Sequence, residues 1–188
     1  DNVWKHPKII DMESYFEMSA IDQLGYVWRD GRLRVKLSKQ VPETAPSVMY
    51  TAASRLLARN WIGLSDIDWF VIHAAGPNVI NNLRDLAKIP EEKTKLSRSI
   101  LNTYGNCSSS TVGLIGKALM QEEIRPGDYI LVMSVGPGMV GGQLLRAGPR
   151  VDSGCGFLQG SAHREILPAF GVGRPAHPSY GEPGLRRE

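Results

Sequence analysis

Cysteine is scarce in this sequence. Among its 188 residues there are two, Cys107 and Cys155, and their spacing fits neither a zinc site nor a disulfide framework. A small secreted domain stabilised by disulfides is therefore excluded, and we expect a reducing, cytoplasmic compartment and no bound metal.

Long apolar runs and a strong charge of one sign are also missing. No apolar stretch reaches the roughly 20 residues that span a bilayer, so we expect no membrane partner. The net charge is +3, and Lys and Arg are scattered along the chain, which argues against a nucleic-acid partner. Hydrophobic residues make up 42% and charged residues 22% of the chain, the balance of an ordinary globular domain.

What the sequence does contain is a regular succession of strand and helix patterns. Residues 14–28 and 32–38 flank Asp30-Gly31, a strong signal for a β-hairpin. In the second of these segments apolar residues alternate with Arg and Lys, which predicts a strand with one buried face.

Helices and short apolar strands then alternate, which predicts a layered α/β domain. Helices are expected over residues 41–62, 78–89, 90–104 and 108–123, and strands over 69–72, 129–133 and 143–145. Pro46 suits the first turn of the first helix. The second helix carries Val79, Ile80, Leu83 and Leu86 on one side.

The character of the chain changes at Gly148. Residues 148–188 are rich in Gly and Pro and show no sustained period, which is typical of a flexible tail. We therefore expect a folded domain over residues 1–147 and a tail over 148–188, flexible or foreign to the domain.

Two polar residues stand at places where chemistry is common. His73 follows the buried strand 69–72, and ligands of α/β sheets gather at the carboxyl ends of strands. Asn106 follows Gly105, and glycine commonly caps the end of a helix. Each also has a structural interpretation, as a strand-end His with local hydrogen bonds and as a turn Asn. The Gly-rich loop 135–142 matches no phosphate-binding motif, and is either a tight turn or a close approach to a ligand.

Three motifs in this order are more specific than any single residue. They are "IHAAGP" (Ile72–Pro77), "YGNCSSS" (Tyr104–Ser110) and "VGPG" (Val135–Gly138). Together they resemble the carboxyl-terminal half of the thiolase-like condensing enzymes, above all the chalcone-synthase-like type III polyketide synthases and secondarily β-ketoacyl-carrier-protein synthase III. The resemblance covers about residues 15–147 and implies one half of a thiolase fold, with a mixed five-stranded sheet and covering helices.

The resemblance implies an acyltransferase that condenses malonyl thioesters onto an acyl starter with loss of carbon dioxide. His73 and Asn106 match the family's catalytic His and Asn, which stabilise the thioester enolate. Acyl-CoA and malonyl-CoA would be substrates, and no cofactor would be bound permanently. Further matches are the loop beside the pantetheine arm of coenzyme A (Ala75, Gly76, Asn78) and the lining of the product pocket (Ser108, Gly136, Pro137, Gly138).

The family's nucleophilic cysteine lies in an amino-terminal half that this chain does not contain. Cys107 directly follows Asn106, so its side chain should diverge from the Asn side chain, and we expect it to be a small buried residue. The expected partners are an amino-terminal half that carries the cysteine, acyl-CoA or acyl-carrier protein, and a second copy of the complete enzyme. The start at Asp1, without Met, fits a processed or partial chain.

Three alternatives stay open at this point. The chain could be a fragment of a β-ketoacyl-carrier-protein synthase III-like enzyme, or a non-catalytic subunit that binds a thioester or a condensing partner. It could also be a stand-alone α/β domain in which Cys107 reacts by itself, since a thiol near a helix start can have a lowered pKa.

Overall fold

The computed structural model describes residues 7–147. With η for a short 3-10 helix, the elements are β1 (Lys8–Phe16), η1 (Met18–Ala20), β2 (Leu24–Arg29), β3 (Arg32–Leu37), α1 (Val41–Arg59), η2 (Leu64–Asp66), β4 (Trp69–Ile72), α2 (Pro77–Ala87), η3 (Glu91–Thr94), α3 (Lys95–Tyr104), α4 (Ser109–Leu119), β5 (Tyr129–Gly136) and β6 (Val140–Ala147). The expected tail lies outside the described residues, so it stays a prediction.

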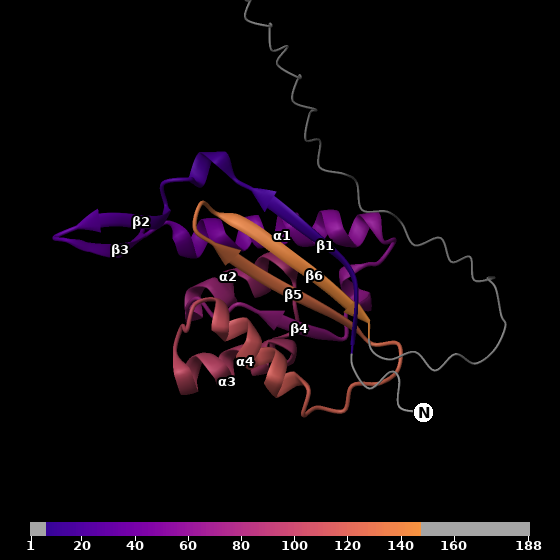
Figure 1. The fold of residues 1–188 in the computed structure, drawn as a ribbon. Coiled ribbons are helices and arrows are strands. Elements are labelled where there is room, and N and C mark those ends of the chain that lie inside the picture. Colours follow the sequence, from indigo (N-terminus) through magenta and orange to yellow (C-terminus); the bar gives the residue numbers. More distant parts are fainter. Residues whose placement is uncertain (1–6, 148–188) are drawn as a thin grey trace, which may run out of the picture. The chain divides into compact units, whose positions relative to one another are not determined.

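The central sheet has four strands in the order β1-β6-β5-β4 (Figure 1). β4 and β5 run parallel, whereas β6 is antiparallel to both β5 and β1. The expected mixed α/β sheet is confirmed, but the predicted number of five strands is wrong for the described part of the chain, where the sheet has four. The reason is that β2 and β3 pair there only with each other. The long first strand is also interrupted, because the Glu17 carboxylate accepts the Ser19 N–H and starts η1.

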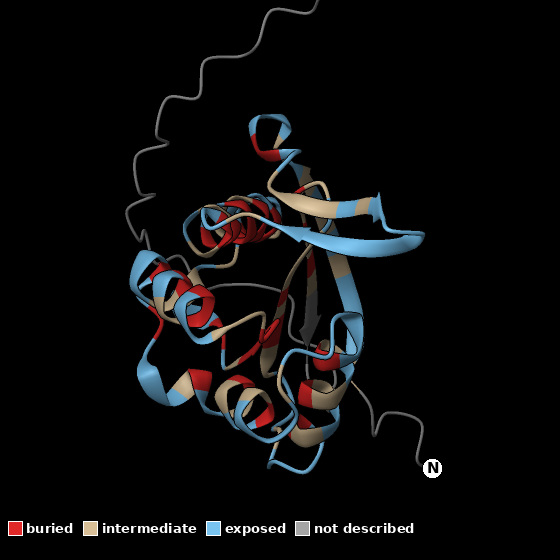
Figure 2. Cartoon of the chain, turned by 90° about the vertical axis from the view of Figure 1, so that its left-hand side faces the viewer, coloured by how far each residue is buried: buried red, intermediate tan, exposed pale blue. Residues whose placement is uncertain are grey.

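Helix α1 packs against this sheet in the core, which also includes residues of α2, α3 and α4. The α1 residues that pack into it are fully or almost fully buried: Ala45, Val48, Met49, Ala52, Ala53, Leu56 and Leu57. In Figure 2, where α1 is seen close to end-on, these buried residues are drawn red. A Cβ atom on Gly141 of β6 would lie 2.9 Å from Val48 Cγ1 and 3.0 Å from the Val48 carbonyl oxygen. The glycine therefore permits the close approach of helix and strand.

Helix α1 begins at Val41 as predicted, but Pro46 does not lie in its first turn. Pro42 occupies the first turn, and Pro46 lies inside the helix, where it is buried. Because Pro46 has no N–H, the carbonyl of Pro42 lacks its usual helical donor. That carbonyl instead accepts a hydrogen bond of 2.8 Å from Asn82 Nδ2 of α2. The helix-internal proline thus creates a contact between two helices.

The hairpin β2–β3 stands apart from the sheet (Figure 1). Asp30 and Gly31 have φ values of 53° and 68°, so the predicted tight turn is confirmed. The prediction that one face of the second strand is buried is wrong, because all six residues of β3 are exposed. One face of the hairpin carries the cross-strand pairs Leu24–Leu37, Tyr26–Val35 and Trp28–Leu33, and the other carries Arg29, Arg32, Arg34 and Lys36. Figure 2 shows β3 exposed along its whole length.

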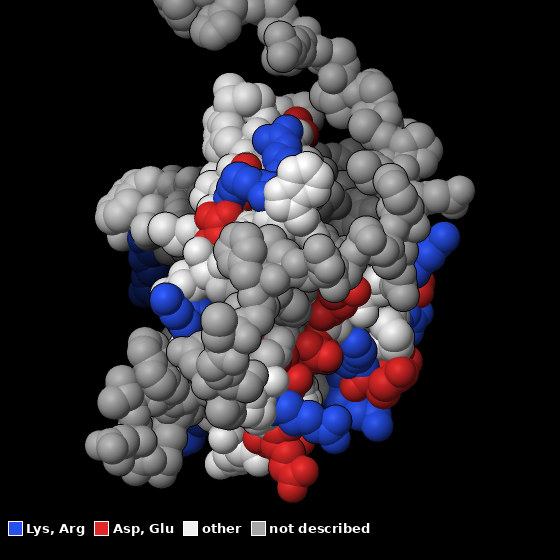
Figure 3. Space-filling model, turned by 90° about the vertical axis from the view of Figure 1, so that its right-hand side faces the viewer, with Lys and Arg blue, Asp and Glu red and all other residues white. Residues whose placement is uncertain are grey.

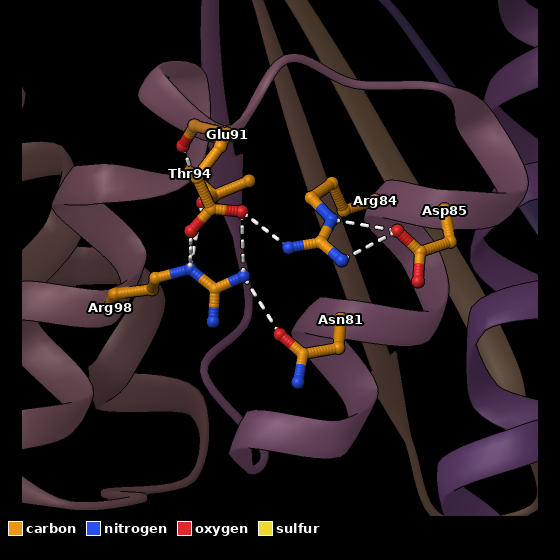
Figure 4. Close-up of polar contacts among 6 residues, drawn as sticks. All are labelled: Asn81, Arg84, Asp85, Glu91, Thr94 and Arg98. Carbon is orange, nitrogen blue, oxygen red and sulfur yellow. Dashed lines mark hydrogen bonds and ion pairs between the residues drawn. The ribbon is translucent and has the colours of Figure 1, made fainter.

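Helices α2 and α3 are joined by a polar network (Figure 4). The Glu91 carboxylate forms ion pairs with Arg84 of α2 at 2.5 Å and with Arg98 of α3 at 2.8 Å. Arg98 also donates to Asn81 Oδ1 of α2 at 2.8 Å and to Thr94 Oγ1 at 2.9 Å. This network fixes the position of α3 against α2. In α2 itself, Val79, Ile80 and Leu83 are buried as predicted, but Leu86 is exposed and Ala87 takes the buried place.

Charged side chains are mixed in sign on the face drawn in Figure 3, where blue and red atoms alternate. This agrees with the scattered Lys and Arg of the sequence. Between residues 7 and 147, no helix is both long and apolar enough to cross a membrane.

Candidate active site

The carboxyl end of β4 presents His73 on a fixed backbone. The His73 N–H donates to the Met133 carbonyl of β5 at 2.8 Å, and the His73 carbonyl accepts the Ala75 N–H at 2.8 Å. One residue earlier, the Ile72 N–H donates to Ser97 Oγ of α3 at 3.1 Å. The backbone on both sides of His73 is therefore held by hydrogen bonds.

The His73 side chain is 7% exposed. Burial lowers the pKa of its imidazole below the ordinary value, because the charged form loses hydration. At neutral pH the ring is therefore uncharged, with one N–H donor and one nitrogen acceptor. Among residues 7–147 the imidazole has no hydrogen-bond partner, and its nitrogens are not among the fully enclosed polar atoms. A neutral N–H donor without a protein partner, at a residue that is otherwise largely buried, is suited to bind a carbonyl or enolate oxygen.

Asn106 reaches the loop that follows His73 from a different part of the chain. Helix α3 ends at Tyr104, and Gly105 adopts a φ of 71° that turns the chain. Asn106 Nδ2 then donates to the Ala75 carbonyl at 3.2 Å, while Asn106 Oδ1 accepts the Ser108 N–H at 2.9 Å. The structure thus brings the predicted Asn to a residue only two positions beyond the predicted His. The second hydrogen on Nδ2 is available for a ligand.

The start of α4 orients the segment that carries Asn106. Ser108 has a φ of 57° and a ψ of −138°. Residues other than glycine rarely adopt this backbone conformation, which marks local strain. Next to it, the Cys107 N–H donates to Thr111 Oγ1 at 2.9 Å. Thr111 is fully buried, so its hydroxyl is a fixed acceptor.

Cys107 differs from its prediction in one respect. It is exposed rather than buried, because the turn before α4 lies at the surface. Its thiol lies 3.4 Å from the Tyr104 carbonyl, whereas the Asn106 amide points to Ala75. The two side chains therefore diverge, as the sequence predicts. Cys155 lies outside the described residues.

The predicted product-pocket residues of the β5–β6 turn lie at the same edge of the sheet as His73. Met133 of β5 pairs with Ile72, and Gly136, Pro137 and Gly138 follow at the carboxyl end of that strand. Gly138 has a φ of 81°, and a Cβ atom there would lie 3.1 Å from Phe16 Cε2. Its N–H donates to the Leu24 carbonyl at 2.9 Å, so the turn is attached to the base of the hairpin.

The residues expected beside the pantetheine arm occupy the passage from the His73 loop into α2. Ala75 and Gly76 are partly exposed and Asn78 is exposed in the first turn of α2. Ser108 is exposed as well. The structure therefore places Ala75 next to Asn106. Among residues 7–147, neither Asn78 nor the Gly136–Gly138 turn forms a hydrogen bond with His73 or Asn106.

Sequence reasoning missed two residues of this site, Ser97 and Thr111. Both are polar and fully buried, and both accept a backbone N–H next to a predicted catalytic residue. A signal existed for Ser97: it lies three positions before the buried Ile100, on the apolar side of α3. A hydroxyl in an apolar stripe indicates a hydrogen-bond partner in the core.

Comparison with known proteins finds a matching family model and several relatives. The family model described as 3-Oxoacyl-[acyl-carrier-protein (ACP)] synthase III C terminal matches residues 57–147. A 3,5-dihydroxyphenylacetyl-CoA synthase of Amycolatopsis balhimycina is 30% identical over 135 residues, 70% of this chain and 36% of the relative. A β-ketoacyl-[acyl-carrier-protein] synthase III of Vibrio cholerae is 33% identical over 117 residues, 61% of this chain and 32% of the relative.

Solved structures show the same fold. The 1,3,6,8-tetrahydroxynaphthalene synthase of Streptomyces coelicolor, a bacterial type III polyketide synthase, matches with a TM-score of 0.71 at 22% identity. The match covers 78% of this chain and 42% of that one. This chain thus spans about a third of the length of the curated relatives it matches, 36% and 32% for the two above.

Proposed function

Because this chain belongs to the thiolase-like superfamily, as a relative of the type III polyketide synthases, we propose that it forms the His/Asn half of a condensing acyltransferase site. The hydrogen bond from Asn106 Nδ2 to the Ala75 carbonyl carries this proposal. It joins the loop after His73 to the loop before α4, so that two donors from distant parts of the chain serve one site.

The proposed reaction is a decarboxylative Claisen condensation. The bond between the malonyl carboxylate and its methylene carbon breaks, carbon dioxide leaves, and the electron pair moves onto the thioester as an enolate. The neutral His73 N–H and an Asn106 N–H donate to the enolate oxygen. One such donor typically lowers a barrier by about 2.7–4 kcal/mol. The enolate carbon then attacks the acyl thioester on a cysteine, and the cysteine leaves as thiolate.

The nucleophilic thiolate is proposed to come from an amino-terminal half. The exposed Cys107 thiol points to the Tyr104 carbonyl and away from the Asn106 amide, which argues against Cys107 in this role. Apolar surface on the described part supports a missing partner. The hairpin exposes Trp28 and Val35. Helix α4 is apolar on most sides, with Lys117 as its one charged residue, and helices of this kind are normally covered.

Substrate binding follows from the same geometry. Acyl-CoA and malonyl-CoA are proposed to bring their pantetheine arm past Ala75, Gly76 and Asn78, with Ser108 and the Gly136–Gly138 turn beside the growing chain. Acyl-carrier protein is the alternative donor, which the match to a synthase III model favours. We further propose that the complete assembly is a cytoplasmic homodimer without a permanently bound cofactor.

A reconstitution experiment tests the proposal. The chain is purified alone and with the cysteine-bearing half of a type III polyketide synthase, and carbon dioxide release from malonyl-CoA is measured. Activity is expected only in the mixture. His73→Ala and Asn106→Ala should each lower the rate by about 100-fold or more, whereas Asn102→Ala, an exposed Asn on α3, should not. If both site variants keep full activity in the mixture, the chain is a non-catalytic binding subunit.

A further inference from the structure

Two hydrogen bonds connect the His73 segment with the Asn106 segment. One runs from the Ile72 N–H to Ser97 Oγ at 3.1 Å, and the other from Asn106 Nδ2 to the Ala75 carbonyl at 3.2 Å. His73 lies between these two connections along the chain. The distance between the predicted catalytic side chains therefore depends on both.

The Ser97 connection is made inside the protein. Ser97 is fully buried on α3, and Ile72 is fully buried at the end of β4. Within residues 7–147, β4 is the outer strand of the sheet and pairs on one side only, with β5. The Ile72 N–H points to the unpaired side, where Ser97 Oγ accepts it. Without this hydroxyl a buried N–H would have no partner, which is unfavourable enough to shift the backbone.

The helix that carries Ser97 is itself fixed in place. The neighbouring residue, Arg98, donates to Asn81 Oδ1 of α2 at 2.8 Å and pairs with Glu91 at 2.8 Å (Figure 4). Lys93, just before α3, donates to the Ile67 carbonyl ahead of β4. Ser97 thus presents its oxygen from a rigid support, as a positioning group requires.

We propose that Ser97 is a positioning residue that sets the place of the His73 imidazole relative to Asn106. Among the described residues it forms a hydrogen bond with neither side chain, and it acts through the backbone of Ile72. Because α3 leads directly into Gly105 and Asn106, one hydroxyl aligns the end of a strand with the helix that carries the second donor. The catalytic part of this inference rests on the proposed function, whereas the placement of His73 does not.

The placement is tested on the chain alone, by an NMR titration of the His73 imidazole. In Ser97→Ala the loosened strand end should admit water, so that the His73 pKa rises toward its ordinary value, since burial is what lowers it. The Ile72 amide should exchange at least about tenfold faster. Ser97→Thr, which keeps the hydroxyl, should restore both. Ser99→Ala, an exposed serine on the same helix, should change neither.

Loss of stability alone would contradict the proposal. If Ser97→Ala lowers the urea midpoint but leaves the His73 titration unchanged, Ser97 is a structural residue only. If Ser97→Ala does not fold, Ser97→Cys takes its place, because the cysteine side chain is similar in size and its sulfur is a weaker acceptor. A raised His73 pKa in Ser97→Cys would support the positioning role, and an unchanged His73 titration would contradict it.

A kinetic measurement separates this inference from the proposed function. In an active mixture with the cysteine-bearing half, Ser97→Ala should lower kcat by roughly 10- to 100-fold, with KM unchanged. A rise in KM with kcat intact would overturn the positioning role. If the mixture is inactive with every cysteine-bearing half, the proposed function fails. The NMR titration of His73 still decides whether Ser97 positions the His73 imidazole.

Discussion

Helix α1 and strand β3 are both amphipathic, with helical spacing of apolar residues in α1 and alternation in β3, but their apolar faces have opposite surroundings. Leu56 of α1 is 0% exposed, whereas Leu37 of β3 is 66% exposed. In the part of the chain that the structure describes, the hairpin pairs only with itself, and an isolated two-stranded ribbon is marginally stable. The comparison teaches that alternation of apolar and polar residues predicts a strand, but not whether the chain itself covers the apolar face.

A pair of leucine truncations should give the largest contrast. Leu56→Ala opens a cavity in the core and is expected to lower the free energy of unfolding by about 2–5 kcal/mol. Leu37→Ala removes exposed atoms, and we expect a change within about 0.5 kcal/mol. Urea denaturation measures both. An equal loss in the two variants would mean that the hairpin is covered in the isolated chain.

Two neighbouring glycines of β6 should give the next largest contrast. A Cβ on Gly141 meets the Val48 carbonyl oxygen at 3.0 Å, whereas a Cβ on Gly142 meets only Ser134 Oγ at 3.7 Å. Gly141→Ala is expected to destabilise the fold by about 1–3 kcal/mol through overpacking, and Gly142→Ala by less than about 0.5 kcal/mol. Thermal unfolding of both variants checks this. Similar losses would show that α1 can move aside.

The hairpin itself should respond in solubility rather than stability. Trp28 is 73% exposed and Val35 lies on the same apolar face. The double variant Trp28→Ser, Val35→Thr should leave the free energy of unfolding within about 0.5 kcal/mol of the parent. It should also reduce self-association, measured by light scattering, because exposed apolar patches promote it. In the reconstituted mixture the same variant should bind the second half more weakly.

The smallest effect is expected from an ion pair at the edge of the core. Arg59 of α1 donates to Asp11 of β1 at 2.9 Å. Through hydrogen bonds from Arg59, from Asn60 and from the Met12 N–H, the pKa of Asp11 falls from 3.8 to about 2. The folded state thus favours the carboxylate, so this stabilisation is full above about pH 4 and is lost as pH falls toward 2.

Acid titration of the urea midpoint measures that loss. Asp11→Asn should show a shallower decline between pH 4 and pH 2 than the parent. The matched change is Asp22→Asn, whose partner Lys36 lies in the hairpin at 3.3 Å. Both side chains are well exposed, so this variant should follow the parent curve. A steeper decline in Asp11→Asn would contradict the cause given for the lowered pKa.

Much of the fold follows from local chemistry that a sequence displays. Asp30-Gly31 predicts its turn because both residues tolerate a positive φ, and the unbroken apolar run Trp69–Ile72 predicts a buried strand. Pro46 misleads because a proline inside a helix is allowed where another donor, here Asn82, reaches the freed carbonyl. That donor comes from a different helix, so no local pattern contains it.

The candidate site divides in the same way. His73 and Asn106 are visible as a strand-end His and a turn Asn, and the motifs around them carry the family resemblance. Ser97 shows only a weak signal, a hydroxyl on the apolar side of α3, and Thr111 shows none, because the role of both depends on the backbone N–H groups they meet after folding. The exposure of Cys107 also depends on how the turn before α4 lies at the surface.

The central claim is that this chain supplies the donors and another half supplies the thiolate. Acylation mapped by mass spectrometry tests it most directly, after incubation of the mixture with an acyl-CoA starter. The account predicts an acyl group on the cysteine of the added half and none on Cys107. An acyl group on Cys107, formed with the chain alone and lost in Cys107→Ser, would contradict it.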